Sequence, residues 1–129
     1  MIYINISSFY KDRFLKDCIK SILDSDIHKE YLIDLYIYDA DKDLIKELSL
    51  TPNIRVNILG SQKNYSEITN LSIKSAQKNN AKYFMMLNSD TILCKDCISI
   101  LSDVLDSSAN VSIVGGYHID YKSSWEIPN

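Results

Sequence analysis

The chain has 129 residues, 46% of them hydrophobic and 24% charged, which is typical of one soluble globular domain with a proper core. Its formal net charge of −3 argues against a nucleic-acid-binding surface. No apolar run approaches the ~20 residues of a membrane-spanning helix and no signal-peptide layout is present, so we expect a cytoplasmic protein. Three cysteines, an odd number, fit reduced thiols better than a disulfide framework.

The chain opens with a predicted strand at residues 2–7, IYINIS, because this run is apolar and rich in β-branched residues. Residues 7–10 then form a turn. A helix is predicted over residues 11–25, where apolar residues recur at helical spacing. These apolar residues are Leu15, Cys18, Ile19, Ile22 and Leu23. The charged residues expected on its solvent face are Lys11, Asp12, Lys16, Asp17 and Lys20.

A second predicted strand, residues 32–38, ends in the acidic residues Asp39, Asp41 and Asp43. Open parallel sheets bind ligands in the crevice beyond the carboxyl ends of their strands. Asp39, the first residue after the strand, is therefore the better candidate for a ligand contact. For Asp41 and Asp43 an equally good interpretation is capping and favourable charge at the amino end of the next helix.

A short helix at residues 42–49 and a strand at residues 54–59 are predicted next. Asn64 and Glu67 have the spacing of a capping box, which predicts the start of another helix. The side chains expected to be buried on it are Ile68, Leu71 and Ala76. Asn70 lies in its first two turns, near the carboxyl edge of the sheet, and is either a ligand contact or a solvent-facing residue.

The most informative stretch is the sequence YFMMLNSDTIL. Residues 83–87 are a largely apolar run suited to a buried strand, and the run ends abruptly at Asn88-Ser89-Asp90-Thr91. Asp90 is a candidate ligand for a divalent cation, and the alternative is a cap for the helix predicted at residues 95–107. A last strand at residues 111–114 and an irregular tail complete the chain.

These elements predict a fold class. Five strands alternate with four helices, which indicates an α/β domain with a Rossmann-like, three-layer α/β/α arrangement and a mainly parallel sheet. In the strand order 3-2-1-4, strands two and four flank strand one. Asp39 and Asp90 would then lie across one cleft at the switch point of the sheet.

At this point the chain resembles the amino-terminal half of a GT-A-fold glycosyltransferase of the family 2 type. The resemblance covers residues 2–120. The segments that carry it are Ser7-Ser8-Phe9-Tyr10, Asp39-Ala40-Asp41-Lys42-Asp43, Gln62-Lys63-Asn64, the asparagine Asn70, and Leu87-Asn88-Ser89-Asp90-Thr91. The last of these is similar to a variant of the family's metal-binding DxD motif, with Asn88 in place of its first carboxylate.

The resemblance implies a glycosyltransferase, or the donor-binding part of one, that transfers a sugar from a nucleoside diphosphate to a glycan or lipid-linked acceptor. Asp90 would bind Mg²⁺ or Mn²⁺ against the diphosphate. The residues implied in donor binding are Ser7, Asp39, Asp43, Asn70 and Asn88, with Asp39 at the base or ribose. The family's general base lies in a following half, so no catalytic residue is assigned.

The resemblance also predicts a single donor-binding domain over residues 1–129 that lacks the acceptor half. Apolar surface left exposed would favour a homo-oligomer, and peripheral membrane association through a partner is a further expectation.

Two other interpretations stay open. One is a non-catalytic nucleotide-binding or assembly module with the same fold. The other is a thiol oxidoreductase, because Cys94 and Cys97 form a CxxC pair between a strand and a helix. Zinc is disfavoured, since a second ligand pair is missing and His28 and His118 stand alone.

Overall fold

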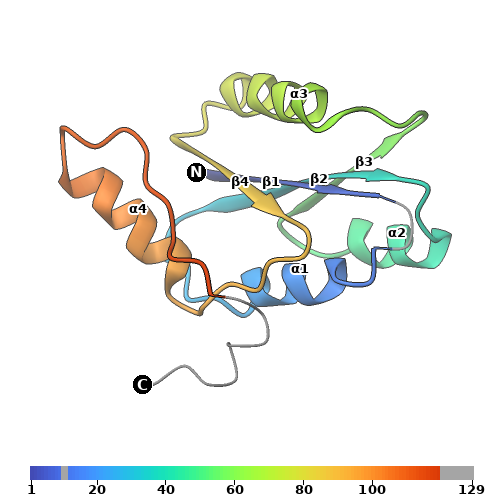
Figure 1. Cartoon of the computed structure of the whole chain (residues 1–129), viewed down its shortest axis with the longest axis horizontal. Helices are drawn as coiled ribbons and strands as arrows, with labels where there is room; N and C mark the ends of the chain where they lie inside the picture. Colours follow the sequence, from blue (N-terminus) through green and yellow to red (C-terminus); the bar gives the residue numbers. More distant parts are fainter. Residues whose placement is uncertain (10–11, 120–129) are drawn as a thin grey trace.

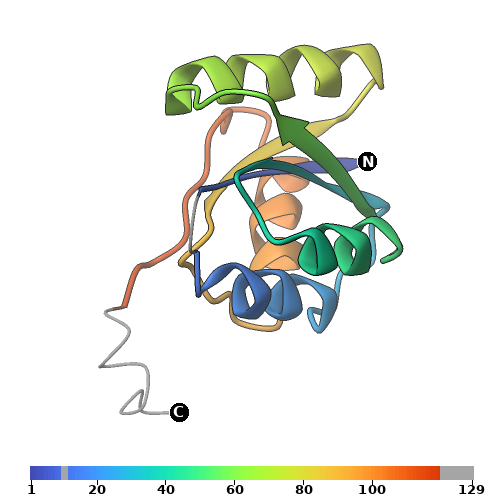
Figure 2. The ribbon, with the colours of Figure 1, turned by 90° about the vertical axis from the view of Figure 1, so that its right-hand side faces the viewer.

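The computed structural model describes residues 1–9 and 12–119. In this part of the chain four parallel strands form one sheet in the order β3-β2-β1-β4. The strands are β1 (Ile2–Ser8), β2 (Tyr31–Tyr38), β3 (Ile54–Leu59) and β4 (Tyr83–Asn88). The helices are α1 (Leu15–Leu23), α2 (Lys42–Ser49), α3 (Tyr65–Lys78) and α4 (Cys97–Ser107). They give three layers, with α3 above the sheet and α1, α2 and α4 below it (Figure 1, Figure 2).

The predicted fold class and strand order are confirmed. Each of the four strands begins and ends within one residue of its predicted bounds. Continuous apolar runs mark strands that are covered on both faces of a parallel sheet, which is why these boundaries could be read from sequence. Strand β1 lies between β2 and β4, so the carboxyl ends of β2 and β4 flank the end of β1.

The lower face of the sheet carries the hydrophobic core. Side chains alternate between the faces along each strand, and Ile2, Ile4 and Ile6 of β1 point to the same side as the corresponding residues of β2 and β4 in the parallel register. These side chains pack against buried residues of the three lower helices, namely Leu15, Cys18, Ile19, Ile22, Leu48 and Ile98. Burial of this apolar surface is the main favourable term in the folding of the domain.

The upper face, beneath α3, is polar instead. Asp34 of β2 is fully buried there, and its carboxylate accepts hydrogen bonds from Arg55 (Nε, 2.9 Å; a terminal guanidinium nitrogen, 2.6 Å), Asn57 (2.8 Å) and Ser72 (2.6 Å). Burial, with the negative charge of Asp34, raises the pKa of Tyr36 to about 12. Helix α3 therefore packs on the sheet through hydrogen bonds as well as through its buried apolar residues Ile68 and Ala76.

The prediction of a last strand at residues 111–114 is wrong. Residues 111–119 form no strand, and Ile113 is 91% exposed. A short apolar run becomes a strand only when another strand's backbone is available to pair with it. Here the chain passes the start of α4 instead, where a Cβ on Gly116 would stand 3.8 Å from the Cys97 sulfur.

Two further predictions need correction. Helix α1 begins at Leu15, not at residue 11, because Asp12 and the residues after it form a turn that ends at the N-cap, Phe14. Leu71, predicted to be buried on α3, is 42% exposed, and Thr69 and Ser72 face the sheet in its place.

In the described residues, no helix combines the length and apolar character needed to cross a membrane.

Candidate functional site

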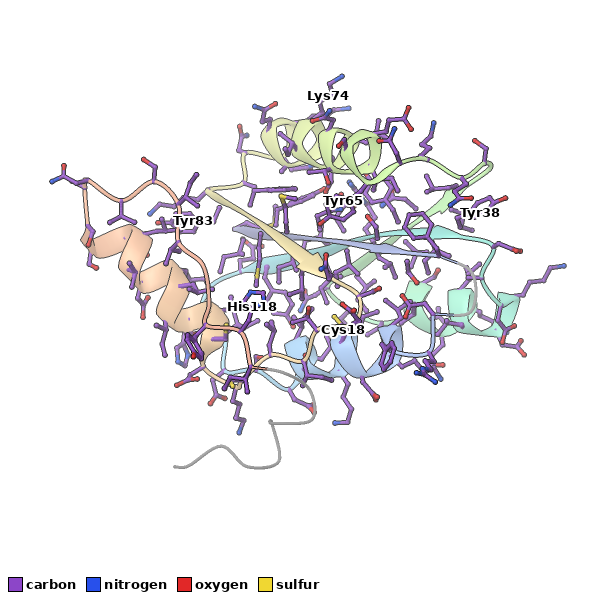
Figure 3. The ribbon with its side chains drawn as sticks, in the orientation of Figure 1. Cys18, Tyr38, Tyr65, Lys74, Tyr83 and His118 are labelled. Carbon is purple, nitrogen blue, oxygen red and sulfur yellow. The ribbon has the colours of Figure 1, made fainter. Side chains whose placement is uncertain are left out.

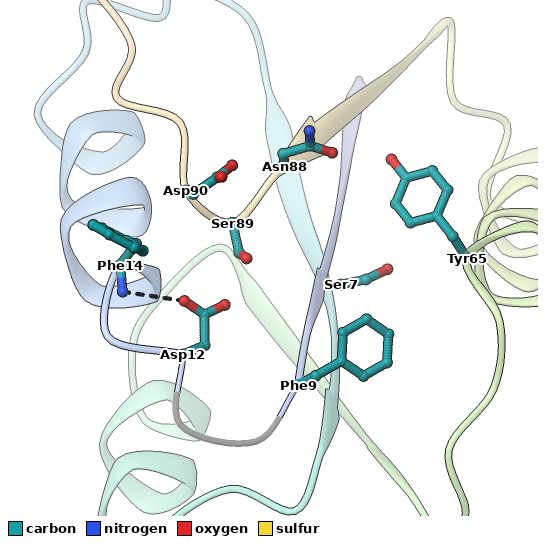
Figure 4. A pocket seen from close by; sticks show the side chains of 8 residues that line it. All are labelled: Ser7, Phe9, Asp12, Phe14, Tyr65, Asn88, Ser89 and Asp90. Carbon is teal, nitrogen blue, oxygen red and sulfur yellow. Dashed lines mark hydrogen bonds between the residues drawn. The ribbon is translucent and has the colours of Figure 1, made fainter. Parts of the chain in front are cut away.

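A pocket of about 410 Å³ lies at the carboxyl ends of β1 and β4. Its lining residues are Ser7, Phe9, Asp12, Phe14, Tyr65, Asn88, Ser89 and Asp90 (Figure 4). They come from two strand ends, the segment before α1, and the first residue of α3. This is the edge of a parallel sheet at which ligands are expected to bind.

The sheet register brings the strand-end residues together. Ser7 of β1 pairs with Asn88 of β4, so the two side chains stand next to each other on the same face. Ser89 and Asp90 follow β4 in a tight turn that is closed by a hydrogen bond from the Thr91 backbone N–H to the Asn88 carbonyl (3.1 Å).

Tyr65 enters the pocket from the opposite side, at the amino end of α3. The predicted capping box is confirmed. Asn64 accepts from the Glu67 backbone N–H (2.9 Å), and the Glu67 carboxylate accepts from the Asn64 N–H (3.2 Å). This cap starts the helix at Tyr65 and directs its side chain toward the pocket (Figure 4).

Asp12 is a pocket residue that the sequence pattern missed. It was expected on the solvent face of a helix, but it precedes the helix. Its carboxylate accepts from the Ser8 hydroxyl (3.0 Å) and from the Phe14 backbone N–H (3.1 Å). An Asp side chain that accepts a hydrogen bond from the backbone N–H two residues ahead forms an Asx turn, which is a common local structure. Because the helical apolar spacing begins at Leu15, Asp12 could have been assigned to a turn from sequence.

Below the pocket, the buried Cys18 thiol of α1 donates to the Asn88 carbonyl at 3.6 Å. Its burial raises its pKa to about 12, a backbone hydrogen bond from Thr91 opposes this rise, and the negative charges of Asp12 and Asp90 add to it. Cys18 is thus a packed neutral thiol, on the side of α1 that faces the sheet (Figure 3).

The pocket has a charged side and a neutral side. Asp12 and Asp90 lie next to α1, whereas Tyr65 lies next to α3, with Ser7 and Phe9 on its side (Figure 4). Of the residues that line it in the described part of the chain, none is Lys, Arg or His. Two carboxylates in one pocket lining give it negative charge, which attracts cations, although the Arg13 guanidinium lies nearby, 4.8 Å from the centre of the Phe14 ring.

The structure brings together three of the predicted site residues, Ser7, Asn88 and Asp90. Asp90 does not cap α4, because that helix begins at Cys97 with Asp96 as its N-cap. Asp39 lies at the same sheet edge, directly after β2, but is not among the lining residues. It is exposed and has a left-handed backbone conformation (φ 53°), which Asp and Asn tolerate better than most residues and which recurs at functional sites.

The other two predicted site residues are outside the pocket lining. Asp43 lies in the first turn of α2, and its backbone N–H donates to the N-cap Asp41 (3.1 Å), as the capping interpretation of Asp41 predicted. Asn70 is exposed and lines a separate hollow on α3, together with Lys74. Lys74 extends away from the sheet (Figure 3).

Whether the pocket suits Mg²⁺ or Mn²⁺ can be judged from its donor atoms. The described residues contain no group of three or more His, Cys, Asp or Glu placed to hold a metal ion. Asp12, Asp90 and Asn88 do offer hard oxygen donors around one space. Mg²⁺ is commonly held by one or two carboxylates together with substrate phosphates and waters. The residues fit such an ion when it arrives with a diphosphate.

Cys97 of the CxxC pair lacks the lowered pKa that activates catalytic thiols. All three cysteines are free, and burial, followed by the nearby Cys94 and Asp96, raises the pKa of the Cys97 thiol. Catalytic thiols instead have a lowered pKa.

The parallel sheet and its strand order give the domain the Rossmann-like α/β fold that the sequence predicted. No protein-family model matches the sequence, and neither does any curated protein. Among solved structures, the chain is similar to TarS, a glycosyltransferase from S. aureus, with a TM-score of 0.65 and 13% identity over 81% of this chain. A structure of TarS residues 1–349 gives a TM-score of 0.64 and 13% identity over 89% of this chain. The chain spans only 19% and 38% of the two TarS chains, and this likeness concerns the fold.

Proposed function

We propose that this chain is the donor-binding part of a glycosyltransferase, of the family 2 type that its motifs resemble. It would bind a nucleoside diphosphate sugar together with Mg²⁺ or Mn²⁺, for transfer to a glycan or lipid-linked acceptor. The observation that carries the proposal is the pocket at the ends of β1 and β4, where Asp12 and Asp90 face one space.

Charge is the physical argument for this ligand. A diphosphate placed beside two carboxylates would be repelled, and the lining residues include no basic side chain to offset the repulsion. A divalent cation placed between the diphosphate and the two carboxylates would be attracted to both and would replace the repulsion by attraction. Asp90 and Asp12 would hold the ion, with Asn88 as a neutral oxygen donor. The ion would supply positive charge to the diphosphate leaving group.

The neutral side of the pocket suits the rest of a nucleotide. Phe9 and Tyr65 offer aromatic faces, and Ser7 offers a hydroxyl. Asp39, on the neighbouring strand end, is the proposed contact to base or ribose, and its exposed position leaves it accessible to a bound nucleotide. Asp43 and Asn70 stay proposed donor contacts on the resemblance alone. No general base is assigned.

Titration of the protein with UDP by calorimetry, with and without Mn²⁺, tests the proposal. We expect binding that needs Mn²⁺ and that weakens at least ~10-fold in Asp90→Asn and in Asp12→Asn, because each substitution removes a charged ligand of the ion. Asp96→Asn is the matched control. Asp96 is an exposed carboxylate in the same connecting segment, and its side chain makes no cap hydrogen bond.

A nucleotide-sugar hydrolysis assay then separates enzyme from binding module. Mn²⁺-dependent turnover that Asp90→Ala abolishes supports the transferase, and binding without turnover supports a non-catalytic module. Equal UDP affinity in the wild type, Asp90→Asn and Asp12→Asn would contradict the proposed site.

A further inference from the structure

Two of the three cysteines are brought together by a turn at the start of α4. The Cys97 backbone N–H donates to the Cys94 carbonyl at 3.1 Å, which closes a four-residue turn directly before the helix. In a β-turn of this kind the first and last Cα atoms lie less than about 7 Å apart. Disulfide-bonded cysteines have Cα atoms about 4.4 to 6.8 Å apart. The backbone therefore already holds Cys94 and Cys97 close to the separation that a disulfide requires.

The turn is also held in place by the chain that follows α1. The Asp26 backbone N–H donates to the Lys95 carbonyl at 2.9 Å, and the Ser99 hydroxyl donates to the Asp26 carbonyl. Residues 24–27 thus lie beside the start of α4 (Figure 1). Because these contacts fix the backbone on both sides of Cys97, little further conformational entropy is lost when the two sulfurs join.

The two thiols differ in their access to solvent. Cys94 is exposed, whereas Cys97 is half-buried, and a Cβ on Gly116 would stand 3.8 Å from its sulfur. Burial, followed by the nearby Cys94 and Asp96, raises the pKa of the Cys97 thiol. Thiol–disulfide exchange requires a thiolate that can reach the disulfide sulfur. A reagent in solution will therefore meet Cys94 first, with Cys97 behind it as the second thiol.

The third cysteine does not compete for this reaction. Cys18 lies in α1, is fully buried, and its thiol donates to the Asn88 carbonyl at 3.6 Å. A small reagent has no access to it in the folded chain, so exchange that begins at Cys94 has Cys97 as its nearby partner.

We propose that Cys94 and Cys97 are a modification site for thiol–disulfide exchange, at which a small-molecule disulfide converts the pair into an intramolecular disulfide. Cys94 is the attacking thiol and Cys97 the resolving thiol, an arrangement typical of redox-sensitive cysteines. The pair is the target of the exchange and not a catalyst with turnover. The proposal does not depend on the donor pocket.

The exchange balances with glutathione disulfide as the oxidant. The Cys94 thiolate attacks one sulfur of the reagent, the S–S bond of the reagent breaks, and one glutathione leaves as a thiolate. The Cys97 thiolate then attacks the Cys94 sulfur of the mixed disulfide, and the second glutathione leaves. The two cysteine protons pass through water to the two glutathione thiolates. Two protein thiols are oxidised to one disulfide, and one glutathione disulfide is reduced to two thiols.

The new bond should stabilise the beginning of α4. It closes a loop of only four residues, from Cys94 to Cys97. Stabilisation by a disulfide grows with the length of the closed loop, so a short loop gives a modest effect. We expect the melting temperature of the oxidised chain to exceed that of the reduced chain by roughly 2–8 °C.

Mass spectrometry of the intact, reduced chain during incubation with glutathione disulfide tests the site. A species with one glutathione on Cys94 should form first. It should then convert into a chain two hydrogens lighter than the reduced one, with Cys94 joined to Cys97 in the peptide map. Dithiothreitol should restore the starting mass, and Cys18 should stay unmodified in the folded chain.

Two variants separate the roles of the thiols. Cys97→Ser should stop at the mixed disulfide on Cys94, because the resolving thiol is missing. Cys94→Ser should react at least ~10-fold more slowly, because only the half-buried thiol with the raised pKa is left in the pair. The matched control is the same pair of variants unfolded in urea with Cys18 blocked. There the turn and the burial are lost, and both variants should react at similar rates.

Four results would overturn the proposal. If the wild type takes up one glutathione on each of Cys94 and Cys97, or links two chains through Cys94, the turn does not bring the two sulfurs together. If folded Cys94→Ser reacts as fast as the wild type, Cys94 is not the attacking thiol. If the folded wild type does not react, the site is closed to small disulfides. If the disulfide lowers the melting temperature, the turn is not built to accept it.

Discussion

Replacing Asp34 by alanine tests the polar attachment of α3. The carboxylate is fully buried and accepts hydrogen bonds from Arg55, Asn57 and Ser72 at 2.6 to 2.9 Å. In Asp34→Ala, the guanidinium loses its counter-ion and the buried Ser72 hydroxyl loses its acceptor. Two strands and one helix are therefore affected by a single change.

The structure indicates how much free energy of unfolding Asp34→Ala should lose. Removal of one partner from a buried ion pair costs about 3–5 kcal/mol, because the other charge is left uncompensated. The Arg55 side chain is 37% exposed, so water screens part of its charge and moves the loss toward about 3 kcal/mol. A domain of this size has a free energy of unfolding of about 5–15 kcal/mol. The melting temperature should fall by roughly 10 °C.

Urea titration followed by circular dichroism, together with thermal melts, measures this loss. Asp24→Ala is the control, since it removes an aspartate paired with Lys20 on the exposed surface of α1, where an ion pair is expected to contribute little to stability. If Asp34→Ala loses less than about 1 kcal/mol, the buried network does not hold α3 on the sheet and the reasoning is wrong.

Three further predictions concern acid stability, thiol reactivity and capping. The hydrogen bond from Lys82 lowers the pKa of Asp106, so this carboxylate stabilises the fold above the ordinary Asp pKa of about 3.9 and loses that effect as the pH falls through its lowered value. The difference in urea midpoint between wild type and Asp106→Asn should thus be present at pH 7 and shrink below about pH 4. Iodoacetamide at neutral pH should label the exposed Cys94 before Cys97, whose raised pKa keeps its thiol protonated, and rapid labelling of Cys97 would revive the thiol-enzyme interpretation. Asn64→Ala should cost about 1 kcal/mol in the urea titration through loss of the α3 cap, and an unchanged midpoint would contradict the observed capping box.

The four strands and the start of α3 could be predicted because local signals determine them. A buried parallel strand is a continuous apolar run, and a capping box is a pair of residues three apart, so both are visible in a short window of sequence. Residues 111–114 have the same apolar character as the true strands, but pairing needs a neighbouring strand edge, and the sequence does not show which edges are available.

The candidate site was predicted only in part, for the same reason. Ser7, Asn88 and Asp90 end their strands, and strand ends in a parallel sheet share one edge. Asp12 escaped detection because a charged residue beside a helix has the same pattern whether it faces solvent or a pocket. Tyr65 was missed because its position depends on how α3 crosses the sheet.

The sequence by itself determined the alternation of strands and helices and hence the parallel α/β class, since these follow from the spacing of apolar residues along the chain. It also placed polar residues at the strand ends. Only the tertiary structure decided that Asp12 joins Asp90 and that Tyr65 lies opposite them. These relations join residues far apart in the chain, and they exist only once α3 and α1 are packed on opposite faces of the sheet.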